Sequence, residues 1–293
     1  MSCTHRAAAV EFSTPNANDI FVIVGCVASN RLRIGDLRPE AAIAVRSVRS
    51  ALKVIADRME AEVVSEKAPF DLTTGTDTRT QTVIRSILEQ ACPEHGFVGE
   101  EGRPHADAGT ATYWLVDPIC GTRNFASKLP LYCVNVALVD GVDVVLGVVG
   151  DGARGEVWVA ERGRGAWSED DGVLRSISAS AASRTVGLDP GRPGGPAAAN
   201  AAKVIAAAIT QGRWELRTLG TTVDLAYLAS GRLAALWHFS RIPPLHFAAG
   251  ALLASEAGAI VTDERGSAWR LSSEGIVAAA AVDLHTSLLA LLD

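Results

Sequence analysis

The stretch YWLVDPICGTRNF, residues 113–125, places an acid and a thiol at the end of an apolar run. Asp117 follows the run directly, and Cys120 stands three residues later, just before Gly121 and Thr122. A carboxylate in such a turn is typical of a site for Mg²⁺, which takes oxygen ligands and works on substrate phosphates. The backbone N–H groups of Gly121 and Thr122, opening a helix or turn, would supply an anion cradle. The thiol of Cys120 is not an oxygen ligand and therefore does not suit a Mg²⁺ site.

Further acids lie near the ends or starts of predicted elements, and each has a simpler interpretation. Asp77, in TGTD, precedes a predicted helix and, taken alone, is more simply explained as its N-cap. Glu100 and Glu101, in VGEEG, are typical of a solvated loop. Asp117 is harder to dismiss, because buried acids are rare unless they are paired or coordinate a metal. The residues alone indicate a metal and phosphate site and nothing more specific.

Two helices are predicted ahead of the Asp117 motif. Pro39 is typical of a helix start, and the apolar residues behind it recur at alternating steps of four and three, which is one helical stripe. The stripe consists of Ala41, Val45, Val48, Leu52, Ile55 and Met59. Gly75 interrupts this pattern, and a second helix is predicted over about 78–90.

Short β-rich runs follow, which are TYWLV, CVNVALV, DVVLGVV and EVWVA. The second and third are joined by DGVD, a hairpin-type turn. Helices followed by an antiparallel meander favour a layered mixture of helices and strands.

Residues 187–197, GLDPGRPGGPA, are rich in glycine and proline and are predicted to be a linker. Beyond it, the chain alternates between helices at about 197–211, 221–230, 245–257 and 284–292 and strands near 214–218, 233–238 and 259–262. The sequence is therefore divided into an N-terminal extension, 1–38, an N-terminal half with the metal and phosphate motifs, 39–186, and a C-terminal α/β half, 187–293.

The composition excludes several function classes. A formal net charge of −6 provides no electrostatic footprint for nucleic acid or an anionic membrane. The apolar stretch at 19–28 is too short to span a bilayer. The five cysteines are odd in number and follow no framework spacing, which favours a reducing, cytoplasmic compartment.

Several motifs in order resemble the inositol monophosphatase family. They are DLTTGTD, FVGEEG, WLVDPICGTRNF, GVVGDGARGEVWVAERGRGAW and LGTTVDLAYLASGRL with LHFAAGALLASEAGAIV, and the resemblance covers about residues 39 to 293. It implies an α/β fold of the five-layered αβαβα sandwich type and a homodimer. It also implies a hydrolase that acts on a small phosphorylated metabolite, such as a sugar, polyol or nucleotide phosphate, with Mg²⁺.

The resemblance also implies roles for individual residues. Glu100, Asp117 and the carbonyl of Ile119 would hold the first metal ion. Asp77 and Thr122 would orient the attacking water. The amides of Gly121 and Thr122 would bind the phosphate.

Three positions depart from the family pattern. The family has aspartate at the positions of Cys120 and His246, and these two aspartates bind the second metal ion together with Asp117. Cys120 and His246 are therefore expected within a few ångströms of each other. The substrate-binding glutamate of the family falls on His238 or Phe239, neither of which offers a carboxylate.

These departures leave three hypotheses open. In the first, phosphatase chemistry survives, and Asp117, Cys120 and His246 hold Zn²⁺ or another transition metal. In the second, no second metal binds, and a Cys120 thiolate with His246 performs a non-hydrolytic biosynthetic reaction such as a cyclisation, elimination or group transfer. In the third, the protein is an inactive homologue that binds a ligand or partner. Hydrolysis at the retained first-metal site is the leading hypothesis.

Overall fold

The computed structural model describes residues 32–57, 63–68, 71–101, 111–191, 195, 198–239 and 242–291. Residues 31–293 form one compact unit, and most of the predicted N-terminal extension, residues 1–31, lies outside the described residues. None of the helices in the described part of the chain is long and apolar enough to cross a membrane.

The first helical layer consists of α1, Pro39–Ala56, and α2, Gly75–Ala91. Pro39 occupies the first turn of α1, where a missing N–H costs no helical hydrogen bond. The α2 helix starts with a capping box, in which the N-cap Thr74 accepts from the Asp77 backbone N–H and the Asp77 carboxylate accepts from the Thr74 backbone N–H. This cap fixes Asp77, and with it one part of the candidate site, at the first turn of α2.

A seven-stranded sheet packs against these helices. Its strands are β3 Gly96–Gly99, β4 Thr112–Cys120, β5 Cys133–Asp140, β6 Asp143–Asp151, β7 Val157–Glu161, β8 Gly165–Asp170 and β9 Val173–Ser176. They lie side by side in this order, with β3 and β4 parallel and the other neighbours antiparallel. The pairing of β4 with β5 becomes irregular between Asp117 and Cys120, so β4 ends in a bulge that carries both side chains.

A second, five-stranded sheet lies in the C-terminal half, with the strand order β11-β10-β12-β14-β13. Its strands are β10 Thr185–Asp189, β11 Glu215–Arg217, β12 Ala235–His238, β13 Ile260–Thr262 and β14 Ile276–Ala279. The strands β10, β11 and β12 are parallel, whereas β14 pairs antiparallel to β12 and β13. A further hairpin joins β1, Val63–Ala68, to β2, Asp71–Thr74.

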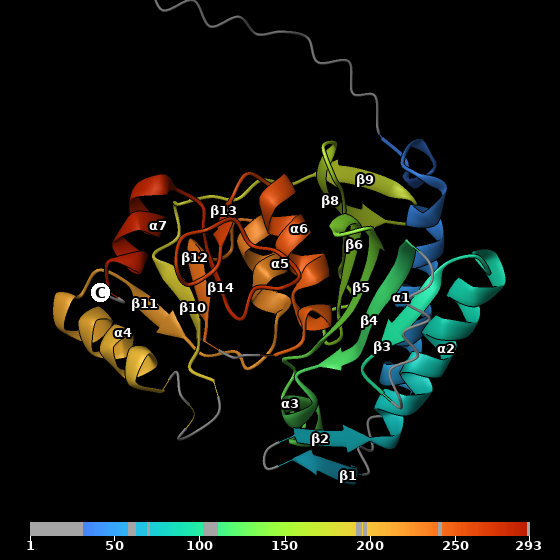
Figure 1. Ribbon diagram of the computed structural model, residues 1–293, viewed down its shortest axis with the longest axis horizontal. Helices are drawn as coiled ribbons and strands as arrows, with labels where there is room; N and C mark the ends of the chain where they lie inside the picture. The colour runs from blue at the N-terminus through green and yellow to red at the C-terminus, as the bar shows by residue number, and fades with distance from the viewer. Residues whose placement is uncertain are drawn as a thin grey trace, which may run out of the picture. The chain divides into compact units, whose positions relative to one another are not determined.

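The five layers follow from which helices cover which sheet faces (Figure 1). The remaining helical elements are η1 Ile34–Asp36, α3 Thr122–Ala126, α4 Ala198–Gln211, α5 Val223–Ala229, η2 Pro244–His246, α6 Ala248–Glu256 and α7 Val282–Leu289. Helices α5 and α6 lie between the two sheets, while α4 and α7 pack on the outer face of the five-stranded sheet. The predicted αβαβα sandwich is confirmed.

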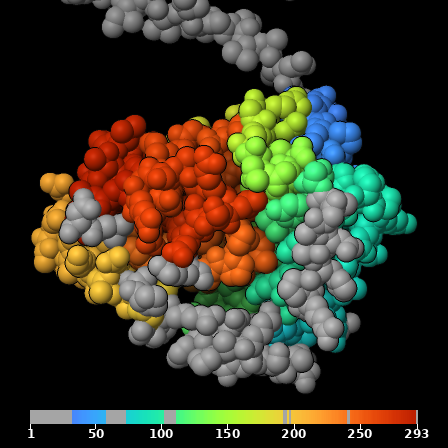
Figure 2. Space-filling view, viewed as in Figure 1, coloured from blue at the N-terminus to red at the C-terminus, as the bar shows by residue number. Residues whose placement is uncertain are grey.

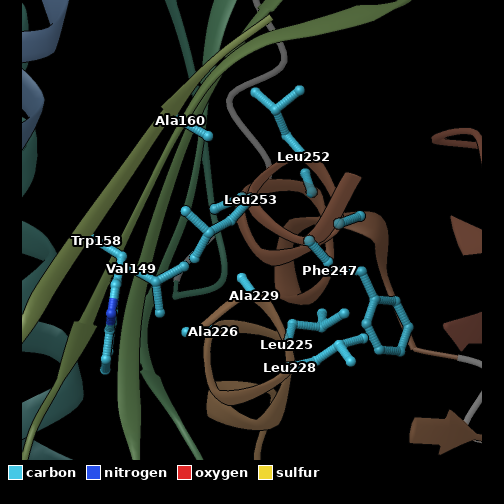
Figure 3. Close-up of a cluster of buried hydrophobic side chains, with 14 of the residues drawn as sticks. Val149, Trp158, Ala160, Leu225, Ala226, Leu228, Ala229, Phe247, Leu252 and Leu253 are labelled. Atoms are coloured by element: carbon cyan, nitrogen blue, oxygen red, sulfur yellow. The ribbon is translucent and has the colours of Figure 1, made fainter. Parts of the chain in front are cut away.

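The central core joins the two halves of residues 31–293. Figure 3 shows Val149 and Trp158 of the seven-stranded sheet on the side of Ala226 of α5 and Leu253 of α6, whereas Leu225 points toward Phe247. In the space-filling view, the C-terminal segments in orange adjoin the N-terminal segments in green, in agreement with the contacts of α6 with β6 and β7 (Figure 2). This burial of apolar surface is the main force that holds both halves of the candidate site in register.

Two sequence predictions are changed by the structure. The linker predicted at 187–197 begins inside β10, a buried strand whose Leu188 is 2% exposed. The end of the predicted extension, residues 32–38, is partly ordered on the sheet edge, because Leu174 N–H donates to the Leu32 carbonyl and Ile34 N–H donates to the Gly172 carbonyl. The division at residue 186 falls within β10 and stays a prediction.

Candidate active site

The candidate site begins where β4 ends and α3 starts. Gly121 connects the two in the left-handed region, with φ of 100°. A Cβ atom there would lie 2.8 Å from the carbonyl oxygen of Leu131, so that only glycine fits without displacing backbone. Thr122 therefore opens α3 directly beside Asp117 and Cys120, and the first amides of α3 have no carbonyl partner within the helix.

Asp77 and Thr122 lie together, as the resemblance implies. The Thr122 hydroxyl is 3.2 Å from Oδ1 of Asp77 and 3.0 Å from the carbonyl oxygen of Ile119. Because the hydroxyl has one proton, it can donate to only one of these two acceptors at a time. Burial raises the pKa of Asp77 to about 6, against the hydrogen bonds from Thr74, and the negative charges of Glu101 and Asp117 add to the rise. Above that pH, Asp77 is ionised, so that its carboxylate can act as a base.

His246 makes the most direct contact of the site. Its Nδ1 lies 2.6 Å from Oδ2 of Asp117, whose side chain is fully buried. Burial lowers the pKa of His246, but the charge of Asp117 and hydrogen bonds to Asp117 and Cys120 outweigh it, and the pKa rises to about 10. The two side chains therefore form an imidazolium–carboxylate pair at neutral pH.

The other carboxylate oxygen of Asp117, Oδ1, is buried and has no hydrogen-bond partner among the described residues. Native structures rarely leave such an atom unsatisfied, and an ion is one common explanation. Glu100, half-buried at the end of β3, lies beside this strand because its N–H donates to the Val116 carbonyl at 3.2 Å. Asp117 Oδ1, Glu100 and the Ile119 carbonyl are oxygen donors of the kind that Mg²⁺ takes, so the residues fit a first ion.

Cys120 is held as a thiol. It is 7% exposed, and its Sγ accepts hydrogen bonds from the Thr222 hydroxyl at 3.1 Å and the Thr222 N–H at 3.4 Å. A hydrogen bond with Cys133, burial and the charge of Asp117 raise its pKa well above the ordinary value, and the hydrogen bond to His246 opposes them only in part. A buried thiol with a raised pKa is a poor nucleophile. The thiolate hypothesis therefore gains no support.

The predicted proximity of Cys120 and His246 is confirmed. One ligand atom each from Asp117, Cys120 and His246 lies within 4.8 Å of the others. The set does not fit a second Mg²⁺, because Oδ2 of Asp117 already pairs with His246 and the other two donors are a thiol and an imidazole. The donor types suit Zn²⁺, but zinc would have to displace a proton from both side chains.

The structure buries His238 and Phe239, whose assignment as substrate-binding residues stays a prediction. Both side chains are 1% exposed. His238 pairs through Nε2 with Oδ2 of Asp224 at 2.7 Å and faces Asp189 with Nδ1 at 3.5 Å. Phe239 packs on Trp237. Both side chains stabilise the end of β12, because the buried imidazole of His238 has polar partners and the phenyl ring of Phe239 has an apolar one.

Two neighbouring residues of the site were not predicted. Thr221 donates to the Cys120 carbonyl at 2.9 Å, and Thr222 binds the Cys120 sulfur. Asn135 of β5 in turn donates to the Thr222 hydroxyl at 3.0 Å. The two adjacent threonines in LGTTVD could have indicated these contacts, because two hydroxyls that precede a buried helix need hydrogen-bond partners.

Comparisons with known proteins find similarity over most of the chain. The model of the inositol monophosphatase family matches residues 36–293. The chain is 33% identical over 248 residues to the Nus factor SuhB of Salmonella typhimurium, covering 83% of this chain and 91% of that protein. It is 34% identical over 216 residues to an inositol-1-monophosphatase of Rhizobium meliloti, covering 73% and 80%. The crystal structure of the extragenic suppressor protein suhB from Bartonella henselae is similar with a TM-score of 0.77 and 26% identity, covering 86% and 97%.

Proposed function

The chain belongs to the inositol monophosphatase family, and from this premise we propose that it hydrolyses the phosphate monoester of a small metabolite with a single catalytic metal ion. In this proposal the cation of His246 replaces the second ion. The observation that carries it is the 2.6 Å contact between Nδ1 of His246 and Oδ2 of Asp117, next to Oδ1, which has no hydrogen-bond partner within the described part of the chain.

Charge balance supports this assignment. By the family pattern, three carboxylates would surround the second ion, whereas here Asp117 is the only carboxylate among those three positions. One imidazolium is enough to offset one carboxylate, and the buried pair has no excess negative charge to attract a further divalent ion. The same Asp117 keeps one oxygen for the first ion.

The chain's own residues retain the parts that hydrolysis needs. Thr122 and Asp77 hold a hydrogen-bonded pair that can orient a water molecule and accept its proton. The first amides of α3, at Gly121 and Thr122, can bind the phosphate oxygens. Glu100, Asp117 and the carbonyl of Ile119 would hold Mg²⁺, which when bound lowers the pKa of water and stabilises negative charge on phosphate.

The test is phosphate release from a panel of sugar, polyol, inositol and nucleotide monophosphates by metal-stripped protein supplied with Mg²⁺, Mn²⁺ or Zn²⁺. We expect release with Mg²⁺ that Asp117→Asn and Asp77→Asn each abolish. Thr210→Val, an exposed change on α4, is the matched control and should leave the rate unchanged. The absence of release by folded protein with every ion and substrate would overturn the proposal.

A second candidate is a binding role without turnover. Its support is the similarity to proteins named Nus factor SuhB, together with the loss of two family aspartates at Cys120 and His246. This candidate predicts no phosphate release, and also predicts that Asp117→Asn leaves partner binding intact. Homodimer formation, expected from the resemblance, is part of both proposals and is checked by sedimentation.

A further inference from the structure

A cluster of metal-binding side chains lies at the opposite end of α2 from the candidate active site. One ligand atom each from Cys92, Glu94 and His95 lies within 4.8 Å of the others. Asp77 lies in the first turn of α2, and Cys92 directly follows the last residue of this helix. With a rise of ~1.5 Å per residue, the two residues are about 22 Å apart along the helix axis. The cluster is therefore separate from the Asp117 site.

The turn after α2 brings the three side chains together. The Cys92 N–H donates to the Leu88 carbonyl and closes the helix, and the His95 N–H then donates to the Cys92 carbonyl at 3.1 Å. This tight turn places a thiol that is 5% exposed next to an imidazole whose side chain is 11% exposed. Glu94, with 66% of its side chain exposed, covers the solvent side.

Both ring nitrogens of His95 are buried without a regular hydrogen-bond partner in the described chain. Nδ1 lies 3.1 Å from Oε1 of Glu94, and Nε2 faces Oε1 of Glu40 at 3.7 Å. The ring also stacks on Trp114, with centroids 6.0 Å apart, which fixes its plane. Histidines that bind zinc commonly coordinate with one nitrogen and direct the other N–H at a carboxylate. Glu40 is placed for the second of these roles.

We propose that Cys92, Glu94 and His95 bind a zinc ion, with Glu40 orienting the imidazole of His95. Thiolate, imidazole and carboxylate are the donors that Zn²⁺ takes, and three protein ligands leave a fourth position for water. Binding releases the thiol proton of Cys92 to solvent. The ion connects the end of α2 to the turn before the edge strand β3, with the first turn of α1 alongside, and it stabilises this corner of the fold.

The test uses Co²⁺ as a spectroscopic substitute for Zn²⁺ on the full chain carrying Cys120→Ser, which removes the thiol of the other cluster. We expect one equivalent of Co²⁺ to give a thiolate-to-metal absorption band that Zn²⁺ abolishes. Glu94→Gln and His95→Gln should each weaken binding, Cys92→Ser should eliminate the band, and Glu40→Gln should weaken binding roughly 10- to 100-fold. Glu89→Gln, an exposed change on α2, is the matched control and should bind as the parent does.

Zinc should also raise the melting temperature of the parent and of Glu89→Gln but not that of Glu94→Gln. Because Glu94 is exposed, its replacement is not expected to disturb folding, so this comparison remains valid even if Cys92→Ser fails to fold. Co²⁺ binding by Glu94→Gln and His95→Gln that is as tight as that of the parent, or no band in the parent, would overturn the proposal. The second result would leave His95 with only its contacts to Glu94 and Glu40.

Discussion

Nδ1 of His246 and Oδ2 of Asp117 are 2.6 Å apart, although 129 residues separate them in the chain. The pair joins the end of β4 in the seven-stranded sheet to the turn before α6, and so crosses between the two halves of residues 31–293. It gives the protein a fixed positive charge at a position where the family pattern implies a metal ion.

Replacing His246 with alanine should destabilise the metal-free protein by about 3 kcal/mol, because Asp117 would remain as an unpaired buried carboxylate. Urea unfolding of metal-free protein measures this change. Asp117→Asn in the same variant should recover part of the loss, since the uncompensated charge is then gone. An unchanged unfolding free energy in His246→Ala would contradict the ion pair.

Thr222→Val should cost about 1–3 kcal/mol, because buried Asn135 Nδ2 loses its oxygen acceptor and keeps only the longer contact to the Cys133 sulfur. The variant also removes the hydroxyl that donates to the Cys120 sulfur. Chemical denaturation is the measurement, and Thr210→Val serves as an exposed control on α4. Equal stabilities of the two variants would show that the Thr222 network contributes nothing.

Gly121→Ala should reduce both stability and activity, because the new Cβ would meet the Leu131 carbonyl at 2.8 Å in addition to the strain at φ of 100°. Gly141→Ala is a matched control, since φ there is 61° and nothing lies within 4 Å of the added Cβ. The control should show only the left-handed strain, of about 1 kcal/mol. Thermal melts and phosphate release of both variants separate the two effects.

Stability should fall as the pH rises above neutrality because of His238. Burial lowers its pKa, but Asp224 and Asp189 outweigh burial and raise it to about 10 in the folded protein. A raised folded-state pKa means that the contribution is complete below the unfolded value of about 6.5 and is lost as the pH rises through about 10. Urea unfolding between these limits should show a decline that His238→Gln reduces.

Much of the fold is accessible from local sequence patterns. The apolar stripe behind Pro39 predicts α1, and the β-rich runs CVNVALV and DVVLGVV with the hairpin-type turn between them predict β5 and β6. The strand β10 is missed because the Gly and Pro residues that follow Asp189 outweigh a short apolar run. Its identity as a strand comes from pairing with β11 and β12, which is not local information.

The candidate site also contains some residues that local motifs predict and some contacts that they do not. The motifs identify Asp77, Asp117 and Thr122 and place Cys120 near His246, because both substitute for residues that share one ion. They do not reveal that Thr222 binds the Cys120 sulfur across 102 residues, nor that His238 is buried between two acids. These contacts depend on how Thr222 at the start of α5 meets Cys120 of β4 and Asn135 of β5, and on how β12 lies beside β10. Only the folded chain establishes both arrangements.

The central claim is that His246 replaces the second metal ion. The most direct test is the number of Mg²⁺ ions bound per chain, measured by calorimetry with inorganic phosphate present, in the natural sequence and in Cys120→Asp with His246→Asp. We predict one ion for the natural sequence and two for the double variant. Two ions in the natural sequence, or no gain in a folded double variant, would contradict it.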